Sequence, residues 1–92
     1  MRNRGRANKR DANEREIVFA LMDIGCSISF LDDPADLLVG YKAKNFLLEV
    51  KSKTGTQSQE QKDFCATWNG QYRIVRTADE AIKVVTESYE QT

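Results

Sequence analysis

Apolar residues recur along this chain with two different periods, which divide it into helices and strands. Ile17, Ala20, Leu21 and Ile24 form a stripe at helical spacing and predict a helix ending near Asp23. The segment 26–31 alternates between apolar and polar residues and predicts a strand, and the segments 36–41, 46–51 and 71–76 predict three more strands. Two further helices are predicted, at about residues 58–68 and from residue 77 onward. The order helix, three strands, helix, strand, helix predicts an α/β domain in which a mixed four-stranded sheet is flanked by helices.

Residues that cap helices stand at the predicted helix starts. Asp11 or Asn13 can cap the first helix, and Thr77 can cap the last. Ser58 is followed three residues later by Gln61, the spacing of a capping box. These residues fix where each predicted helix begins.

The second and third strands are close enough in sequence to form a hairpin, with Lys42–Asn45 as its loop. In a symmetric register Asp36 pairs with Lys51 and Leu38 pairs with Glu49. One face of this hairpin is then wholly apolar, and the other carries Asp36, Leu38, Gly40, Leu47, Glu49 and Lys51. Two acids and a lysine therefore meet at the open end of one face. A surface charge pair, worth only about 0–1 kcal/mol, is the simplest alternative.

The clustered acids predict a metal site. Two neighbouring carboxylates repel each other unless a cation lies between them, and an all-oxygen set of ligands suits Mg²⁺ or Mn²⁺. Such an ion can polarise a phosphate oxygen. The lysine can stabilise developing negative charge or orient an attacking water. Asp36, Glu49 and Lys51 are therefore candidates for hydrolytic chemistry.

Composition agrees with this chemistry and excludes several others. The chain has 92 residues, 40% of them hydrophobic and 30% charged, which predicts one globular domain over residues 11–92. It contains no histidine, which excludes Ser-His-Asp and Cys-His catalysis and Cys₂His₂ fingers. Cys26 and Cys65 are too few for a four-cysteine zinc site and are expected to be reduced, buried thiols. No apolar run approaches the roughly 18 residues that a membrane span needs.

Charge is distributed unevenly, although the net charge of the chain is zero. Five of the fourteen basic residues stand in positions 1–10 without an acid, which leaves the remainder at −5. A flexible basic arm on an acidic body is typical of DNA binding, and a plain solvated tail is the alternative. The candidate DNA contacts of the arm are Arg2, Arg4, Arg6, Lys9 and Arg10.

Asp36, twelve intervening residues and Glu49-Val50-Lys51 resemble the signature of the PD-(D/E)xK nuclease superfamily. The flanking residues are similar to the small stand-alone VRR-NUC domain nucleases of phages and prophages. The matching blocks, with x for positions that do not count, are DANxxEIV (11–18), GCS (25–27), DLLVG (36–40), NxLLEVK (45–51), QxxF (61–64) and WxGQ (68–71). The resemblance implies a restriction-endonuclease-like αβββαβ core.

The resemblance also implies roles for individual residues of the motif. Asp36 and Glu49 would hold Mg²⁺ or Mn²⁺, with the backbone carbonyl of Val50 as a further ligand. Lys51 would be the catalytic lysine. Gln61 would support the site or contact the DNA backbone, unless it only caps its helix.

Other assignments stay open. Glu16 matches the first-helix acid that completes the metal site in the family, while Glu14 matches the spacing of related junction resolvases. Either acid can equally face solvent. Lys53 would meet a phosphate or stay solvated. Phe64 and Trp68 favour core positions over base stacking because of their helical spacing.

Together these features predict a metal-dependent endonuclease that hydrolyses DNA phosphodiester bonds, with selectivity for branched or junction DNA. The resemblance implies a homodimer in the cytoplasm of a bacterial host, with no membrane partner and no nucleotide cofactor. Ala35 separates Pro34 from Asp36 and the loop 52–57 is short, departures from the family that bear on the choice of DNA structure. A non-catalytic DNA-binding or assembly module is the alternative, and so is one subunit of a larger nuclease.

Overall fold

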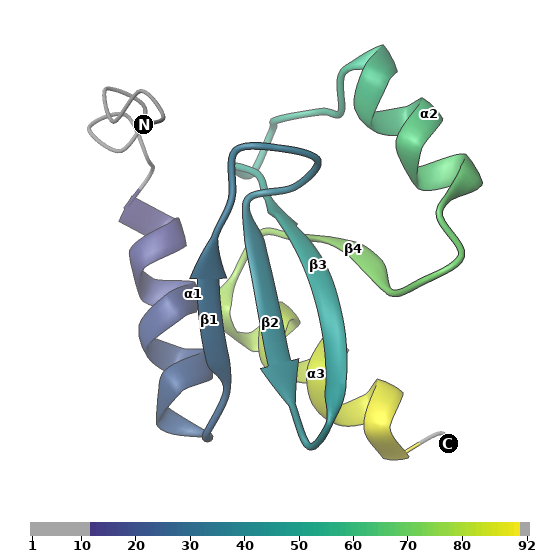
Figure 1. Ribbon diagram of the computed structural model, residues 1–92. Coiled ribbons are helices and arrows are strands. Elements are labelled where there is room, and N and C mark those ends of the chain that lie inside the picture. Colours follow the sequence, from purple (N-terminus) through teal and green to yellow (C-terminus); the bar gives the residue numbers. More distant parts are fainter. Residues whose placement is uncertain (1–11, 91–92) are drawn as a thin grey trace.

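The computed structural model describes residues 12–90 (Figure 1). The predicted basic arm, residues 1–10, and the candidate cap Asp11 lie outside the described residues. The elements follow the predicted order, and they are α1 (Ala12–Asp23), β1 (Ser27–Phe30), β2 (Leu37–Tyr41), β3 (Lys44–Val50), α2 (Gln59–Thr67), β4 (Tyr72–Val75) and α3 (Ala78–Glu90).

The four strands form one mixed sheet in the order β1-β2-β3-β4. The pairs β1–β2 and β2–β3 are antiparallel, whereas β4 runs parallel to β3. A parallel neighbour requires a crossover connection, and α2 lies in that connection. The predicted α/β class, with an αβββαβ order and a mixed four-stranded sheet, is therefore confirmed.

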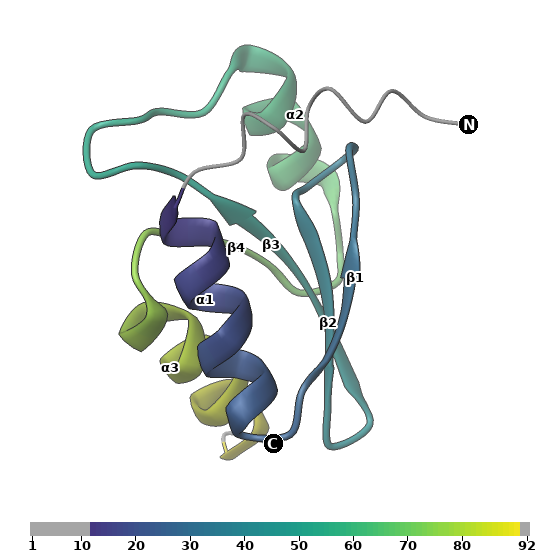
Figure 2. The same cartoon turned by 90° about the vertical axis from the view of Figure 1, so that its left-hand side faces the viewer.

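The hydrophobic core lies on one face of the sheet. There α1 and α3 lie side by side and cover the strands (Figure 2). The residues of this core are Ile17, Val18, Leu21, Cys26, Leu37, Val39, Phe46, Leu48, Val75, Ala81 and Val85. The helix α2 buries none of its residues and stands apart from the other two helices (Figure 1). No helix within residues 12–90 is long and apolar enough to cross a membrane.

The hairpin loop is shorter than predicted. Only Lys42 and Ala43 form the turn, and both have positive φ, +50° and +69°. Two consecutive residues with positive φ match a type I′ turn, whose twist suits a two-residue hairpin. The predicted four-residue loop and its register were therefore wrong by two residues, and Leu38 pairs with Leu47.

This correction keeps every side chain on its predicted face, because a shift by two residues preserves the alternation of a strand. It does change which residues face one another. Continued past Leu37 and Leu48, the observed register brings Asp36 opposite Glu49 rather than Lys51. The two carboxylates are thus closer to direct neighbours than the sequence analysis expected.

Asn13 is not the cap of the first helix. It lies within α1, and its Nδ2 donates to the carbonyl oxygens of Lys51 at 3.0 Å and Arg76 at 3.4 Å. The helix is thereby attached to the chain just beyond β3 and β4. The capping box of α2 is confirmed: Ser58 Oγ accepts from Gln61 N at 3.2 Å, and Gln61 Oε1 accepts from Ser58 N at 2.9 Å.

Candidate active site at the open end of the hairpin

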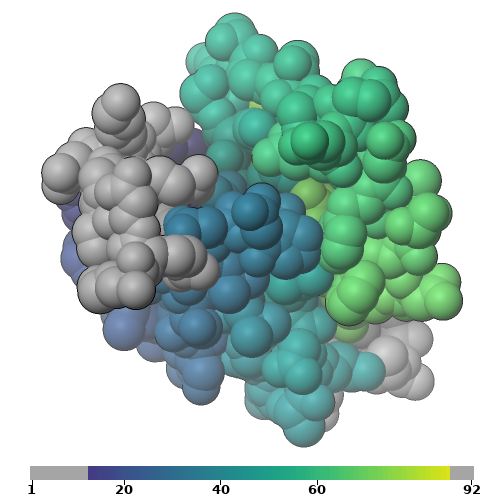
Figure 3. All heavy atoms as spheres, turned by 45° about the horizontal axis from the view of Figure 1, so that its top comes forward, coloured from purple at the N-terminus to yellow at the C-terminus, as the bar shows by residue number. Residues whose placement is uncertain are grey.

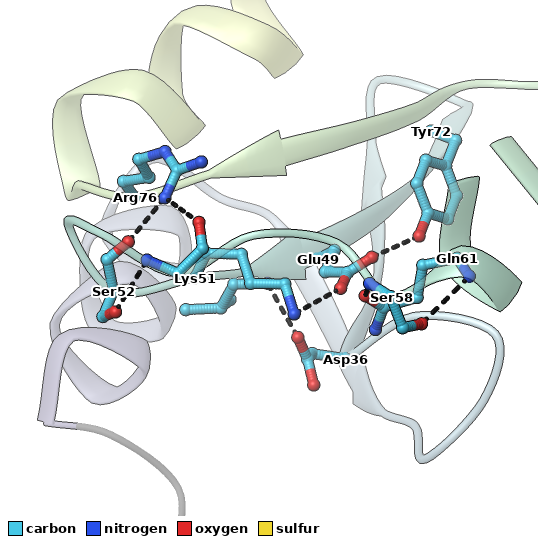
Figure 4. Close-up of polar contacts among 10 residues, drawn as sticks. Asp36, Glu49, Lys51, Ser52, Ser58, Gln61, Tyr72 and Arg76 are labelled. Atoms are coloured by element: carbon cyan, nitrogen blue, oxygen red, sulfur yellow. Dashed lines mark hydrogen bonds and ion pairs between the residues drawn. The ribbon is translucent and has the colours of Figure 1, made fainter.

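Glu49 is the most deeply buried charged residue of the site. It lies near the end of β3, where 1% of its surface is exposed. Its Oε1 accepts a hydrogen bond from the Tyr72 hydroxyl, and its Oε2 lies 3.0 Å from Lys51 Nζ (Figure 4). A buried carboxylate is costly unless it is paired, so these two partners hold Glu49 in place.

The two carboxylate oxygens of Glu49 differ in their partners. Oε1 accepts the hydrogen bond from the Tyr72 hydroxyl. Oε2 is in ion-pair contact with Lys51 Nζ, and no second polar partner reaches it among the described residues. Oε2 therefore keeps a lone pair available for a further ligand.

Asp36 immediately precedes β2 and is fixed against β3 by two hydrogen bonds. Its carboxylate Oδ2 accepts from the Val50 N–H at 2.7 Å, and its own N–H donates to the Leu48 carbonyl at 3.0 Å. A backbone donor bound to a carboxylate gives a short, charge-assisted hydrogen bond. The structure thus brings Asp36, Glu49 and Lys51 together at the open end of the hairpin, as their spacing indicated (Figure 4).

The backbone of Lys51 is held by two hydrogen bonds, and the loop after it is held by Arg76. The N–H of Lys51 donates to the Val75 carbonyl at 3.1 Å, and its carbonyl accepts from Asn13. Beyond it, Arg76 Nη1 donates to the carbonyls of Ser52 and Gly55, the latter at 2.9 Å. Lys51 therefore starts from a fixed main chain, while 21% of its side-chain surface remains exposed.

Tyr72 is the site residue that the sequence analysis missed. It is the first residue of β4, pairs with Leu47 of β3 and is buried. Burial raises the pKa of its hydroxyl, and the hydrogen bond to Glu49 and the negative charge of Glu49 raise it further. The hydroxyl stays protonated and donates to the carboxylate. Strand alternation was the available signal, but it does not reveal that β4 pairs with β3.

The two candidate acids of the first helix lie in different environments. Glu16 is exposed on α1 and Glu14 is buried. Within residues 12–90, no three histidine, cysteine, aspartate or glutamate side chains come together in a group that could hold a metal ion. The described acidic part of the site is therefore the pair Asp36 and Glu49.

The remaining predicted residues have mixed placements. Gln61 serves in the capping box beside the site, and Lys53 is exposed on the loop that follows Lys51. The N–H of Val50 is used by Asp36. Both cysteines are free as expected, but only Cys26 is buried, whereas Cys65 is exposed.

Comparisons with known proteins identify no relative: no family model, no curated protein and no solved structure matches this chain.

Proposed function

We propose that this protein is a metal-dependent endonuclease that hydrolyses DNA phosphodiester bonds, and that Asp36, Glu49 and Lys51 form its active site. The observation that carries the proposal is the buried Glu49, whose Oε2 lies 3.0 Å from Lys51 Nζ. Asp36 is fixed beside it by the Val50 N–H. Carboxylates held next to a lysine are a set of groups that can act on a phosphate without a histidine.

Asp36 and Glu49 would hold Mg²⁺ or Mn²⁺, with the Val50 carbonyl as a further oxygen ligand. The donor set fits because all its ligands are oxygens and Glu49 Oε2 has room in its coordination. Mg²⁺ usually keeps several waters and binds through one or two carboxylates plus substrate phosphates, so two acids suffice. The ion, when bound, supplies Lewis acidity at the phosphate.

Lys51 would act on the charge that develops during cleavage. Its ammonium group is held by Glu49 and still reaches solvent, where a phosphate can approach. It can donate a hydrogen bond to a phosphate oxygen or orient the attacking water. Lys53, exposed two residues further on, would add a phosphate contact.

The proposal extends to a homodimer that prefers branched DNA. A small domain offers little surface to grip a duplex, and two copies would present two sites to two strands. The exposed Phe19 and Met22 of α1 supply an apolar surface that suits association of copies. The expected setting is the cytoplasm of a bacterial host, with the protein encoded by a phage or prophage.

The test is cleavage of labelled four-way junction, flap and linear duplex DNA with Mg²⁺, with Mn²⁺ or with EDTA. Wild-type protein is expected to cut DNA only when Mg²⁺ or Mn²⁺ is present. The Glu49→Gln variant is expected to lose cleavage, because the substitution removes the negative charge but keeps the shape of the side chain. Lys83→Ala is the matched control, since Lys83 lies in an exposed ion pair on α3.

Folded wild-type protein that cuts none of these DNAs with either metal would contradict the proposal. If it still bound DNA, the non-catalytic module would replace the enzyme. Cutting that survives Glu49→Gln would place the reaction elsewhere.

A further inference from the structure

The outer face of the sheet is hollowed beside the candidate active site. The hollow has a volume of about 160 Å³ and is lined by Leu38, Asn45, Phe46, Leu47, Trp68, Gly70 and Gln71. It is called the Trp68 pocket below. In the space-filling view, α2 and the connection between β1 and β2 stand on either side of a depression on this face (Figure 3).

Trp68 forms one wall of the pocket and is held firmly. It follows α2 directly, and its ring stacks on Phe64 with 5.1 Å between ring centroids and 22° between ring planes. A side chain at position 70 would collide with it, because a Cβ there would lie 2.7 Å from the indole Nε1. Even so, 46% of Trp68 is exposed. An aromatic ring that is stacked on a neighbour and still partly exposed can stack on a ligand as well.

The floor of the pocket continues the strands that carry the two carboxylates. Leu38 and Leu47 face each other across the hairpin, and each lies two residues from Asp36 or Glu49 on the same strand face. Two residues of a strand span roughly 6–7 Å. A nucleotide whose phosphate lies at the carboxylates can therefore reach the pocket with its own base.

We propose that the Trp68 pocket receives an unpaired base of the DNA strand whose phosphate is bound at Asp36 and Glu49. This inference rests on the proposed function and assigns its substrate class. Bases in a duplex are stacked and paired, so they cannot enter the pocket without being extruded. The protein therefore prefers DNA with single-stranded nucleotides beside the cut, such as a flap or an open junction.

Stacking on an aromatic residue tolerates any base, because every base has a π face. The amides of Asn45 and Gln71 line the pocket and offer both donors and acceptors, which suits any base edge. The pocket therefore selects strandedness rather than sequence.

Trp68 is the single tryptophan of the chain, so its fluorescence reports on this pocket alone. Wild-type protein is titrated with Ca²⁺ in place of Mg²⁺, so that a cation is available to hold the phosphate at the carboxylates. The ligands are a short oligothymidylate and a blunt duplex of the same length. The single strand is expected to quench the fluorescence, and the duplex to leave it unchanged.

Three variants are compared by the anisotropy of a labelled oligothymidylate. Trp68→Leu is expected to weaken its binding about 5- to 150-fold, the usual range for loss of one stacking residue. Leu38→Gln changes the pocket floor at a position that is 37% exposed, so folding is retained, and it is expected to weaken binding in the same direction. Lys83→Ala is the matched control, because Lys83 lies in an exposed ion pair on α3, away from this face. Duplex affinity is expected to stay the same in all three.

Equal quenching by single strand and duplex, or wild-type affinity in both Trp68→Leu and Leu38→Gln, would overturn the pocket assignment. The proposed function fails separately. If wild-type protein cuts no DNA but the single strand still quenches the fluorescence of Trp68, the pocket assignment is supported and the proposed nuclease activity is contradicted. If Glu49-dependent cutting is present and the two pocket variants behave as wild type, the pocket alone falls.

Discussion

The two faces of the β2–β3 hairpin hold their side chains in different ways. The inner face presents Leu37, Val39, Phe46 and Leu48, all fully buried beneath α1 and α3. The outer face carries Asp36 and Glu49 at its open end, and next to them Leu38 and Leu47, which form the floor of the Trp68 pocket. The inner face is stabilised by undirected burial, at about 1.5–3 kcal/mol for each large side chain. The outer face depends on a few directed polar contacts.

This contrast teaches that the fold and the candidate chemistry are separable in one hairpin. Adjacent residues of a strand point to opposite faces, so Leu48 serves the core while Glu49 serves the site. A variant on one face is expected to affect stability, and a variant on the other to affect activity. Each prediction below tests that division, from the largest expected effect to the smallest.

Phe46→Ala breaks the inner face. It removes the largest fully buried side chain and leaves a cavity, so we expect a loss of about 3–5 kcal/mol in the free energy of unfolding. Urea denaturation followed by circular dichroism measures it. Leu47→Ala, the next residue on the outer face, is the control and should cost far less. Equal losses at the two positions would contradict the division between faces.

Lys51→Ala breaks the outer face. We expect cleavage of the preferred DNA to slow by about 10²- to 10³-fold, the usual result of removing one donor that stabilises transition-state charge. The midpoint of thermal unfolding, measured alongside single-turnover cleavage, should move much less than in Phe46→Ala. A rate within threefold to fivefold of wild type, on the order of 1 kcal/mol or less, would remove Lys51 from the reaction.

Tyr72→Phe leaves the ring packing in place and removes the hydroxyl that donates to Glu49. The buried Oε1 then loses its donor, and we expect the free energy of unfolding to fall by about 1–3 kcal/mol. Tyr41→Phe is the control. Tyr41 belongs to the inner face and contacts Lys42 through its ring, so loss of its hydroxyl should have little effect. If the two variants were equally stable, the hydrogen bond between Tyr72 and Glu49 would not contribute to the stability of the fold.

At alkaline pH, one titrating group of the core, Cys26, and one of the candidate site, Tyr72, are expected to lower the free energy of unfolding. Burial raises the pKa of the Cys26 thiol above its ordinary value of 9.0, and the pKa of Tyr72 is raised above 10.0. The unfolded chain then loses these protons first. The stability contributed by each group is complete below its ordinary pKa and is lost as pH rises through the raised one.

The free energy of unfolding should therefore fall above about pH 9, by at most about 1.4 kcal/mol per pH unit for each group. Cys26→Ala should remove the part that begins near 9.0, and Tyr72→Phe the part that begins near 10.0. Urea titrations at a series of pH values measure both slopes. A slope that neither substitution changes would show that other groups are responsible.

The order of elements was predictable because each element carries its own periodicity. The two faces of the hairpin were predictable for the same reason, and they brought Asp36, Glu49 and Lys51 to one end. The turn was not, because Lys42-Ala43 lacks the glycine or asparagine that usually marks a two-residue hairpin. The wrong register did no harm to the site, since an even shift changes partners but not faces.

Long-range contacts were the part that the sequence could not provide. Asn13 has the chemistry of a helix cap, yet it bonds to residues 38 and 63 positions away. Tyr72 reaches Glu49 only because β4 lies parallel to β3, and no local pattern encodes which strands become neighbours. Trp68 was expected in the core, yet the structure leaves it half exposed against Phe64.

The parallel pairing of β3 and β4 also determines when the site is completed as the chain folds. A hairpin closes early because its contacts are local, whereas β4 docks only after the α2 crossover has been made. A growing chain thus presents Glu49 well before Tyr72, 23 residues later, has emerged to bind it. The carboxylates take their final arrangement only after β4 has been synthesised, so a chain that stops before Tyr72 lacks the complete candidate site.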